Sequence, residues 1–460
     1  MRHGQIAAAL EQLDPGTITG RPEVLAHSYE DAGESQRASE LWAEAGRLAV
    51  TRGANREAAA AFEKALGLLE ALPQSKQTEI EALDVRIALG PVLFGLYGSS
   101  PEVEASYQQA LVLAERLADR PRLFQVNWGL NYYTRMVVGR YAEALQPARR
   151  LLELANRDDD GAERIEAHHA MWGILLWTGQ PAKAFEHLEQ GRALYEPDRH
   201  SYLRYRYAGH DPGACCSALS AIFHWLMGYP ERSQRDLAAL RLRIDQLHHP
   251  MTNILLAFAS WAQYRLGEFK TASLWGAEFV DSAGRHGFQA LAEPAIVLTE
   301  LARPTPSTAR QLRELNERLV QGKSSKSLTL TMRSILVDLC AAAGDVELTE
   351  QVLTPLLAVR DSMHRAEFLR IQGALMLQRA TPDASSAERS FQDAIEVARQ
   401  QGAKSFELRA ATSLAALWHR QGKRNDAREL LDGVYAWFTE GFQTPDLQRA
   451  KSLLDEWAIP

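Results

Sequence analysis

The sequence has little cysteine, no long apolar run and no excess of positive charge. Cys215, Cys216 and Cys340 are its cysteines, and three thiols at these positions form neither a disulfide framework nor a zinc knuckle. The longest apolar run, residues 254–262, is too short to span a bilayer, and residues 1–16 lack the apolar core of a signal peptide. We therefore expect a cytoplasmic protein with no membrane segment.

The charge balance and the motifs exclude further classes. A net charge of −7 offers no general attraction to a polyanion, so we expect no nucleic-acid partner. The pair Gly322–Lys323 lacks the earlier glycine of a phosphate-binding loop, because Glu317 stands in its place. No zinc-protease motif or nucleophile elbow is present. The sequence thus predicts no catalytic residue, no cofactor and no metal.

What the sequence does contain is a repeated turn signal. A glycine is followed five residues later by a small residue in eight places: Gly33 and Ala38, Gly53 and Ala58, Gly139 and Ala144, Gly179 and Ala184, Gly228 and Ser233, Gly267 and Ala272, Gly344 and Thr349, and Gly422 and Ala427. Glycine closes a helix in the left-handed conformation, and a small residue lets the next helix approach closely. Each pair therefore predicts a helical hairpin.

The spacing of these glycines predicts a repeat of about forty residues. From Gly139 the intervals are 40, 49, 39, 77 and 78 residues. The last two are double steps, so two turns should lie near residues 306 and 383. The segments 303–308 (RPTPST) and 380–386 (ATPDASS) supply helix breakers at both places.

Several units resemble the tetratricopeptide repeat. An aromatic residue stands between two alanines at Ala58, Phe62 and Ala65, and again at 387–394. The segments GANREAAAAFEKAL, GRYAEALQPARRLL and GQPAKAFEHLEQG carry the resemblance best. It implies an all-α fold, a right-handed superhelical α-solenoid of helical hairpins, although the period exceeds the family's 34 residues. Stacked repeats share one core, so residues 22–460 should form a single solenoid with an insertion at 196–216.

At a larger scale, residues 21–66, the GHDPG turn and residues 400–456 resemble the C-terminal region of bacterial predicted STAND-type ATPases, which are often fused to class III adenylate/guanylate cyclase domains. The resemblance implies that residues 1–21 are a junction helix left from a missing upstream domain. It also implies a regulatory scaffold that binds a protein partner, an ATPase or cyclase module, or a small-molecule ligand. Two alternatives stay open: an enzyme with a site beneath the insertion, and an inactive truncated family member.

Two groups of residues are candidates for ligand or partner binding. The insertion contributes Arg204, Arg206, Tyr207, His210 and Asp211. Here an aromatic loop packed on the solenoid, with Asp211 capping the next helix, is the structural alternative. The second group stands on first helices of the hairpins, which line the concave surface in the tetratricopeptide family: Trp128, Asn131, Tyr132, Arg135, His168, Trp172 and Arg265. Aromatics at this spacing are also typical of a core.

Overall fold

The computed structural model describes residues 20–98, 100–155, 161–302, 308–322 and 325–457. These residues form helices and turns and contain no β-strand. Almost all of the expected junction helix, residues 1–19, lies outside the described residues. No helix in the described part of the chain is both long and apolar enough to cross a bilayer.

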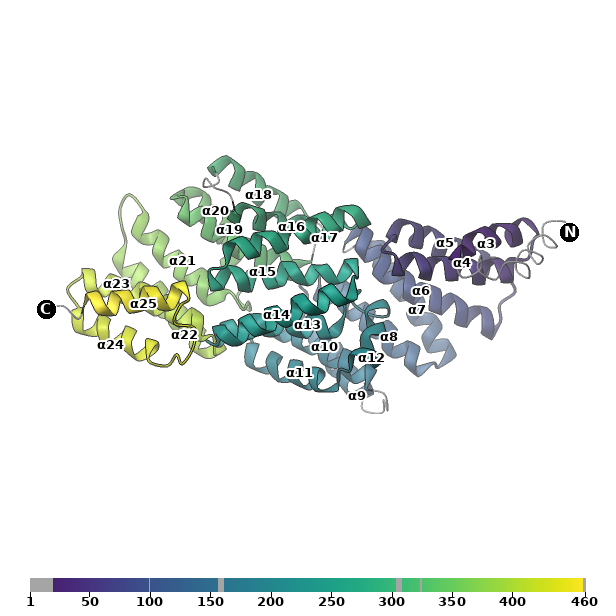
Figure 1. Cartoon of the computed structure of the whole chain (residues 1–460), viewed down its shortest axis with the longest axis horizontal. Coiled ribbons are helices and arrows are strands. Elements are labelled where there is room, and N and C mark those ends of the chain that lie inside the picture. Colours follow the sequence, from purple (N-terminus) through teal and green to yellow (C-terminus); the bar gives the residue numbers. More distant parts are fainter. Residues whose placement is uncertain (1–19, 99, 156–160, 303–307, 323–324, 458–460) are drawn as a thin grey trace.

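The first half of the chain is a row of antiparallel helices that begins at the N-terminal end of the molecule (Figure 1). Its α-helices are α3 (Pro22–Asp31), α4 (Ser35–Thr51), α5 (Asn55–Ala71), α6 (Lys76–Tyr97), α7 (Pro101–Leu117), α8 (Arg120–Asn131), α9 (Tyr141–Ala155), α10 (Ala162–Trp177), α11 (Pro181–Leu194), α12 (Pro197–His200), α13 (Pro212–Leu226) and α14 (Pro230–Leu247). A π-helical turn, η1 (Tyr132–Met136), extends α8, and a 3-10 helix, η2 (Ser201–Tyr205), follows α12.

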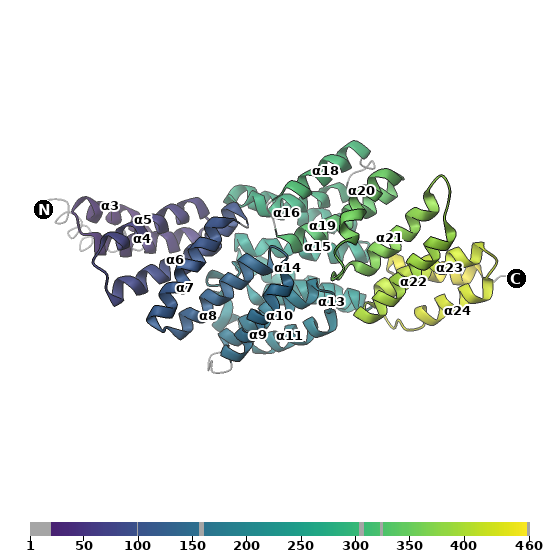
Figure 2. The same ribbon diagram turned by 180° about the vertical axis from the view of Figure 1, so that it is seen from behind.

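The second half continues the row to the C-terminal end, as the reverse view also shows (Figure 2). Its helices are η3 (Pro250–Asn253), α15 (Ile254–Leu266), α16 (Phe269–His286), α17 (Gln289–Ala292), η4 (Glu293–Ala302), α18 (Ala309–Gln321), α19 (Lys326–Ala342), α20 (Val346–Leu357), α21 (Arg365–Gln378), α22 (Ala384–Gln401), α23 (Lys404–Arg420), α24 (Arg424–Tyr435) and α25 (Pro445–Glu456). The all-α solenoid of tetratricopeptide-like hairpins is thereby confirmed.

The predicted turns are present. All eight glycines of the repeated signal have positive φ, between 71° and 87°, and all eight small residues that follow them are fully buried. The double step before Gly422 also contains its expected turn, because Asp383 ends a non-helical stretch and caps α22 through the amide of Ser386 at 3.0 Å. The other expected turn, near residue 306, falls on residues 303–307, outside the described part.

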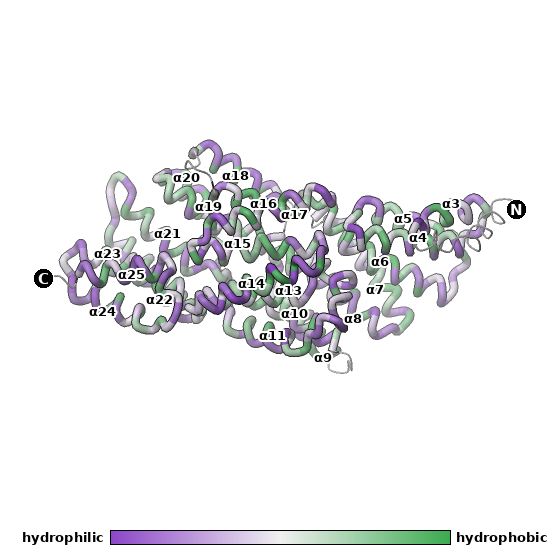
Figure 3. Tube along the Cα trace, viewed as in Figure 1, coloured by the Kyte–Doolittle hydropathy of each residue, from purple (hydrophilic) through white to green (hydrophobic). Residues whose placement is uncertain are grey.

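Burial divides the two helices of a hairpin. In α10, 12 of 16 residues are buried, and in α13, 12 of 15 are. Their partners α11 and α14 bury only 4 of 14 and 5 of 18 residues, on one face. Figure 3 shows the same contrast in hydropathy, with hydrophilic colour along α14 and α18. First helices therefore lie inside the superhelix, and second helices form its outer wall.

The interior is filled because successive turns of the superhelix touch. The amide of Lys326 donates to the carbonyl of Val137 at 2.7 Å. The Glu440 carboxylate accepts from the backbone amides of Glu231 at 2.9 Å and Arg232 at 3.1 Å. Such partners lie about 180 to 210 residues apart in the chain. The solenoid is thus wound tightly enough for one superhelical turn to rest on the next.

Candidate ligand cavity beneath the insertion

The insertion, residues 196–216, folds over the inner face of the superhelix. It begins with the short helix α12, continues through η2, and ends where Asp211 caps α13 through the amide of Ala214 at 2.9 Å. Two hydrogen bonds hold it against α8 and η1. The Tyr133 hydroxyl donates to the carbonyl of Tyr207 at 2.6 Å, and the Gln125 amide donates to the carbonyl of Arg206 at 2.8 Å.

A cavity of about 880 Å³ lies under this insertion. Its walls come from segments far apart in the chain: the α4–α5 hairpin, α6, the start of α8, the insertion itself, and residues 249–251 with Phe288. The volume is in the range of small-molecule sites. Its polar lining consists of Arg47, Thr51, Asn55, Asp84, Arg122, Gln125, Glu163, Tyr202, Arg204, Tyr205, Arg206, Tyr207 and His249.

Arginine dominates the charge of the lining. Arg122 is neutralised, because its guanidinium binds Asp84 at 2.6 and 2.9 Å and Asp119 as well. Arg204 lies over the Tyr205 ring at 4.4 Å, and its buried Nε has no hydrogen-bond partner among the described residues. Arg206 lies 5.2 Å from the Tyr202 ring centroid. The insertion therefore presents two guanidinium groups on aromatic supports.

His249 adds an imidazole that is neutral at physiological pH. Its Nδ1 lies 3.1 Å from the Thr252 hydroxyl, and its ring packs edge-on against Tyr205 with centroids 5.2 Å apart. Burial, with a smaller effect of Arg204, lowers the His249 pKa to about 4. The site can thus offer positive charge from arginine, hydrogen bonds from tyrosine and histidine, and apolar walls such as Val92 and Phe288.

The sequence candidates in the insertion separate into two groups. Arg204, Arg206 and Tyr207 line the cavity, whereas His210 and Asp211 do not. Asp211 is fully buried and accepts hydrogen bonds from the Tyr195 hydroxyl at 2.6 Å and from Arg243 at 3.0 Å, besides its cap. The structural alternative for Asp211, a helix cap, is what the structure contains.

The aromatic candidates of the first helices meet in the core beside the cavity. Trp128 is buried, donates from Nε1 to the carbonyl of Glu166 at 2.8 Å and stacks on Tyr132 at 4.7 Å. Trp172 is fully buried as well. Tyr207 joins this cluster to the cavity, because its ring lies 5.1 Å from Trp128. These aromatics support the cavity wall rather than face an open groove.

Three polar candidates of the same group lie elsewhere. Asn131 is buried and donates to the carbonyl of Ala144 at 3.2 Å, which ties α8 to α9. His168 is half-buried and faces His187, with their Nδ1 atoms 3.0 Å apart. Arg135, in the π-helical turn, is half-buried and does not line the cavity. None of the three belongs to the site described above.

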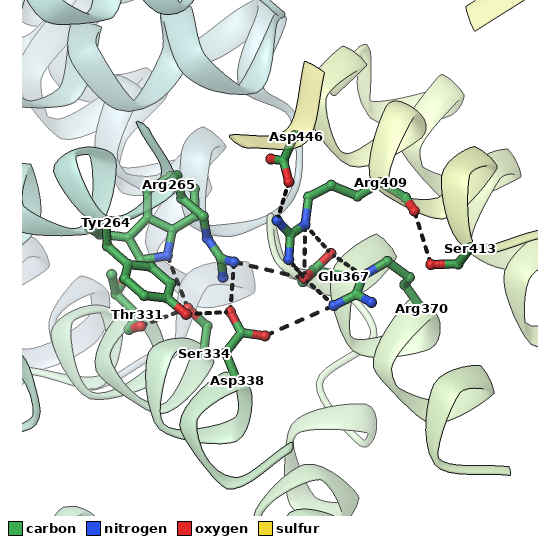
Figure 4. A network of polar contacts seen from close by, with 11 residues as sticks. Tyr264, Arg265, Thr331, Ser334, Asp338, Glu367, Arg370, Arg409, Ser413 and Asp446 are labelled. Carbon is green, nitrogen blue, oxygen red and sulfur yellow. Dashed lines mark hydrogen bonds and ion pairs between the residues drawn. The ribbon is translucent and has the colours of Figure 1, made fainter. Parts of the chain in front are cut away.

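Arg265 does not line the cavity and belongs instead to a buried ion network (Figure 4). Its guanidinium binds Asp338 at 2.7 Å and approaches Glu367 to 3.8 Å. Glu367 is fully surrounded, accepting also from Arg370 and Arg409 at 2.8 Å. Arg409 continues to Asp446 at 2.6 Å. Three arginines and three carboxylates thus balance, and the network joins α15, α19, α21, α23 and α25.

Sequence reasoning missed most of the cavity. Arg47, Asp84, Arg122 and His249 line it without carrying a motif, and they come from helices that adjoin only after the superhelix has wound. The one local signal was the long interval between Gly179 and Gly228, which marked the insertion. That interval identified Arg204, Arg206 and Tyr207 but could not identify the residues opposite them.

Comparison with known proteins gives limited resemblance. No protein-family model matches the chain. An uncharacterized protein of Rhizobium meliloti (strain 1021) is 26% identical over 408 residues, which is 85% of this chain and 39% of that protein. The chain therefore spans about two fifths of the length of this curated relative.

Among solved structures, a Rap protein complexed with competence and sporulation factor overlaps 85% of this chain and 99% of its own, with 13% identity and a TM-score of 0.45. A human IFIT1 dimer with PPP-AAAA overlaps 97% of this chain and 93% of its own, with 13% identity and a TM-score of 0.41. At these scores neither ligand can be transferred. The chain is an all-helical, tetratricopeptide-like repeat protein, similar in part to these two.

Proposed function

We propose that this chain is a non-catalytic regulatory array that binds a small anionic ligand beneath the insertion and passes its occupancy to a signalling ATPase or nucleotide cyclase module. The observation that carries the proposal is the composition of the cavity wall. The α4–α5 hairpin, the insertion and residues 249–251 contribute to one cavity although they are up to about 200 residues apart. A ligand that touches all three stabilises one winding of the superhelix over others.

The lining favours a ligand with a carboxylate or phosphate and an apolar body. Among the described residues, no close carboxylate pairs with Arg204 or Arg206, nor with Arg47 on the opposite wall, and a guanidinium binds planar oxyanions through paired N–H donors. Phe62, Val92 and Met251 supply apolar contacts. A site with few polar anchors on apolar walls is the common form of a small-molecule pocket.

The titratable groups of the lining favour binding over catalysis. Asp84 is held by Arg122, and His249 is hydrogen-bonded to Thr252 and uncharged. A general base needs access to a nucleophile and a pKa near the working pH. Asp84 is occupied by Arg122, and the pKa of His249 lies well below neutral pH, which is why the enzymatic alternative is not preferred.

The ligand proposal is tested by calorimetry and thermal unfolding with a panel of small carboxylates and phosphates. We expect at least one compound to bind the wild-type chain and to raise its Tm. The double variant Arg204→Ala, Arg206→Ala should lose that binding, whereas Arg310→Ala, an exposed arginine on α18, should retain it. Equal binding by all three proteins would contradict the assignment, and so would a panel without any binder.

The partner proposal rests on the resemblance to the C-terminal region of predicted ATPases and is tested separately. The matched region of the Rhizobium meliloti protein is only 39% of a longer chain, so in that protein the array is joined to further sequence. An ATPase or cyclase module from the same source as this chain should bind it, and its turnover should change when the cavity ligand is added. Unchanged turnover at saturating ligand would favour the inactive alternative.

A further inference from the structure

Beside the cavity, the structure brings together two histidines and a cysteine that the sequence analysis did not connect. His169 lies on α10, His210 lies in the insertion, and Cys215 lies in the first turn of α13. One ring nitrogen of each histidine and the Cys215 sulfur all lie within 4.8 Å of one another. All three residues are buried. His169 and Cys215 are 46 residues apart, so the group does not form a short sequence motif.

The distances suit a tetrahedral metal. The His169 Nε2 and Cys215 Sγ atoms are 3.5 Å apart. Two ligands of tetrahedral zinc, with bonds of about 2.0 Å to nitrogen and about 2.3 Å to sulfur, are separated by about 3.5 Å. The Nε2 atom of His210 is buried and has no hydrogen-bond partner among the described residues. A buried ring nitrogen without a partner is costly in a filled core, and a metal ion would satisfy it.

The surroundings hold both imidazoles in the orientation that a metal requires. The Glu166 carboxylate lies 3.0 Å from Nδ1 of His169, which directs Nε2 of that ring toward Cys215. A carboxylate behind a histidine ligand is a recurring feature of zinc sites. His210 is engaged through the backbone of Ala208, which leaves Nε2 available. The His169 ring is further fixed by stacking on Trp172 at 4.8 Å.

The electrostatics are consistent with a cation at this point. Glu166 places a buried carboxyl group in the core, in contact with the His169 ring. A divalent ion at this point would displace the Cys215 thiol proton and compensate the charge of the thiolate in the core.

We propose that His169, His210 and Cys215 form a zinc site with three protein ligands and an open fourth position. Imidazole and thiolate are the ligands that Zn²⁺ prefers. The ion would connect α10 with the insertion and α13. Because Tyr207 and Gly209 of the cavity wall directly precede His210, metal occupancy would also fix the wall of the ligand cavity. This site is independent of the ligand proposed above, since none of its three residues lines the cavity.

The test uses the full chain after removal of metal by a chelator. Zinc added to the stripped protein should bind at one ion per chain, measured by elemental analysis after desalting, and should raise the Tm. Cobalt in its place should give a thiolate-to-cobalt charge-transfer band and the visible bands of a tetrahedral ion. These spectra need no variant, so they test the site even if a substitution prevents folding.

Variants assign the ligands. Cys215→Ala should abolish the charge-transfer band, and His210→Ala should weaken zinc binding at least tenfold. Cys216→Ala is the matched control, because this neighbouring thiol is also buried and lies outside the group. It should retain both band and stoichiometry. The proposal is overturned if stripped wild-type protein binds no stoichiometric zinc, if cobalt gives no thiolate band, or if Cys215→Ala binds both metals as the wild type does.

Discussion

His364 is an imidazole that the fold has removed from water without giving it a partner. It is fully buried, and neither ring nitrogen has a hydrogen-bond partner among the described residues. The ring packs against Trp261 at 5.4 Å and Phe368 at 5.8 Å. Burial, together with the nearby charge of Arg265, lowers its pKa to about 3. The residue therefore behaves as an apolar side chain at neutral pH, and its burial destabilises the fold in acid.

This environment predicts that His364 lowers the free energy of unfolding increasingly as the pH falls. In the unfolded chain the imidazole takes up a proton near pH 6.5, whereas in the folded chain it does so only near pH 3. The unfolded state binds more protons between these values, so the free energy of unfolding falls as the pH falls, by up to about 1.4 kcal/mol per pH unit. Above pH 6.5 the residue adds no pH dependence.

Replacing His364 by leucine should remove this dependence. We expect the stability of His364→Leu relative to the wild type to increase steadily as the pH is lowered from 6.5 toward 4, and to be constant between pH 7 and 8. Urea unfolding at each pH measures the difference, and contributions from all other groups cancel in it. Parallel stability curves for the two proteins would show that His364 is not held uncharged.

At the scale of elements, Asp211 attaches the insertion to the helices of the solenoid. Its carboxylate caps α13 and also binds Tyr195, which directly follows α11, and Arg243 of α14. An aspartate that only caps a helix contributes about 0.5–2 kcal/mol. A fully buried one that also pairs with an arginine contributes more, because its removal leaves the arginine without a counter-charge.

The two roles can be separated by substitution. Asp211→Asn keeps an oxygen for the Ala214 amide but loses the charge opposite Arg243, and Asp211→Ala loses both. We expect both substitutions to lower the free energy of unfolding. The alanine variant should be less stable than the asparagine variant by about 1 kcal/mol, which is the usual contribution of a helix cap. Chemical denaturation measures both. Equal stabilities for the two variants would mean that the cap contributes nothing at this position.

The ion network that connects five helices has Glu367 at its centre, in contact with three arginines. Although burial alone would raise its pKa, the guanidinium groups of Arg370 and Arg409 hold the pKa of Glu367 well below its usual range. A carboxylate with a depressed folded pKa stabilises the fold above its unfolded pKa of about 4.5, and this stabilisation is lost as the pH falls below that value. Replacing one member of such a network leaves the remaining charges uncompensated.

We therefore expect Glu367→Gln to lower the free energy of unfolding at pH 7 by about 3–5 kcal/mol. The variant should also lose less stability than the wild type between pH 5 and pH 3, because it has no carboxylate to protonate. Glu314→Gln is the control, since this exposed carboxylate pairs with Arg310 on the surface and should change stability by less than about 0.5 kcal/mol. Similar effects for the two substitutions would refute a special role for the network.

At the scale of the whole molecule, the helical repeat could be predicted from the sequence, whereas the contacts between successive superhelical turns could not. The eight glycine turns were visible because each depends on residues only five positions apart, and a buried small residue stands after every one. Contacts between superhelical turns join residues 180 or more positions apart, such as Ser405 and Trp225. No periodicity in the sequence records such a pair.

This difference explains why candidate residues of the first helices are buried instead of lining an open groove. In an open solenoid the first helices would face a groove, and Trp172 and Arg265 would line it. The closed winding buries both instead, one in an aromatic cluster and one in an ion network. Between the N-terminal helices and residues 249–251, the insertion forms one wall of the cavity. The interrupted spacing pointed to the insertion with Arg204 and Arg206, but Arg47, Asp84 and Arg122 on the opposite walls could not be predicted from it.

The contact between turns is testable at two matched glycines. Gly228 and Gly422 occupy the same place in their hairpins, with φ of 87° and 85°. A Cβ atom on Gly228 would lie 2.6 Å from the Trp437 ring and 3.0 Å from Lys404, on the next superhelical turn, whereas one on Gly422 would meet no atom within 4 Å. Alanine at either site carries the same left-handed backbone strain of about 1–2 kcal/mol.

Gly422→Ala should therefore be destabilised only by this strain. The free energy of unfolding of Gly228→Ala should fall by about 1–3 kcal/mol more, because Trp437 and Phe438 must move away. If that displacement separates the two turns, small-angle scattering will show a larger radius of gyration for Gly228→Ala and an unchanged one for Gly422→Ala. Equal destabilisation of the two variants, with equal dimensions, would mean that the turns do not rest on each other in solution.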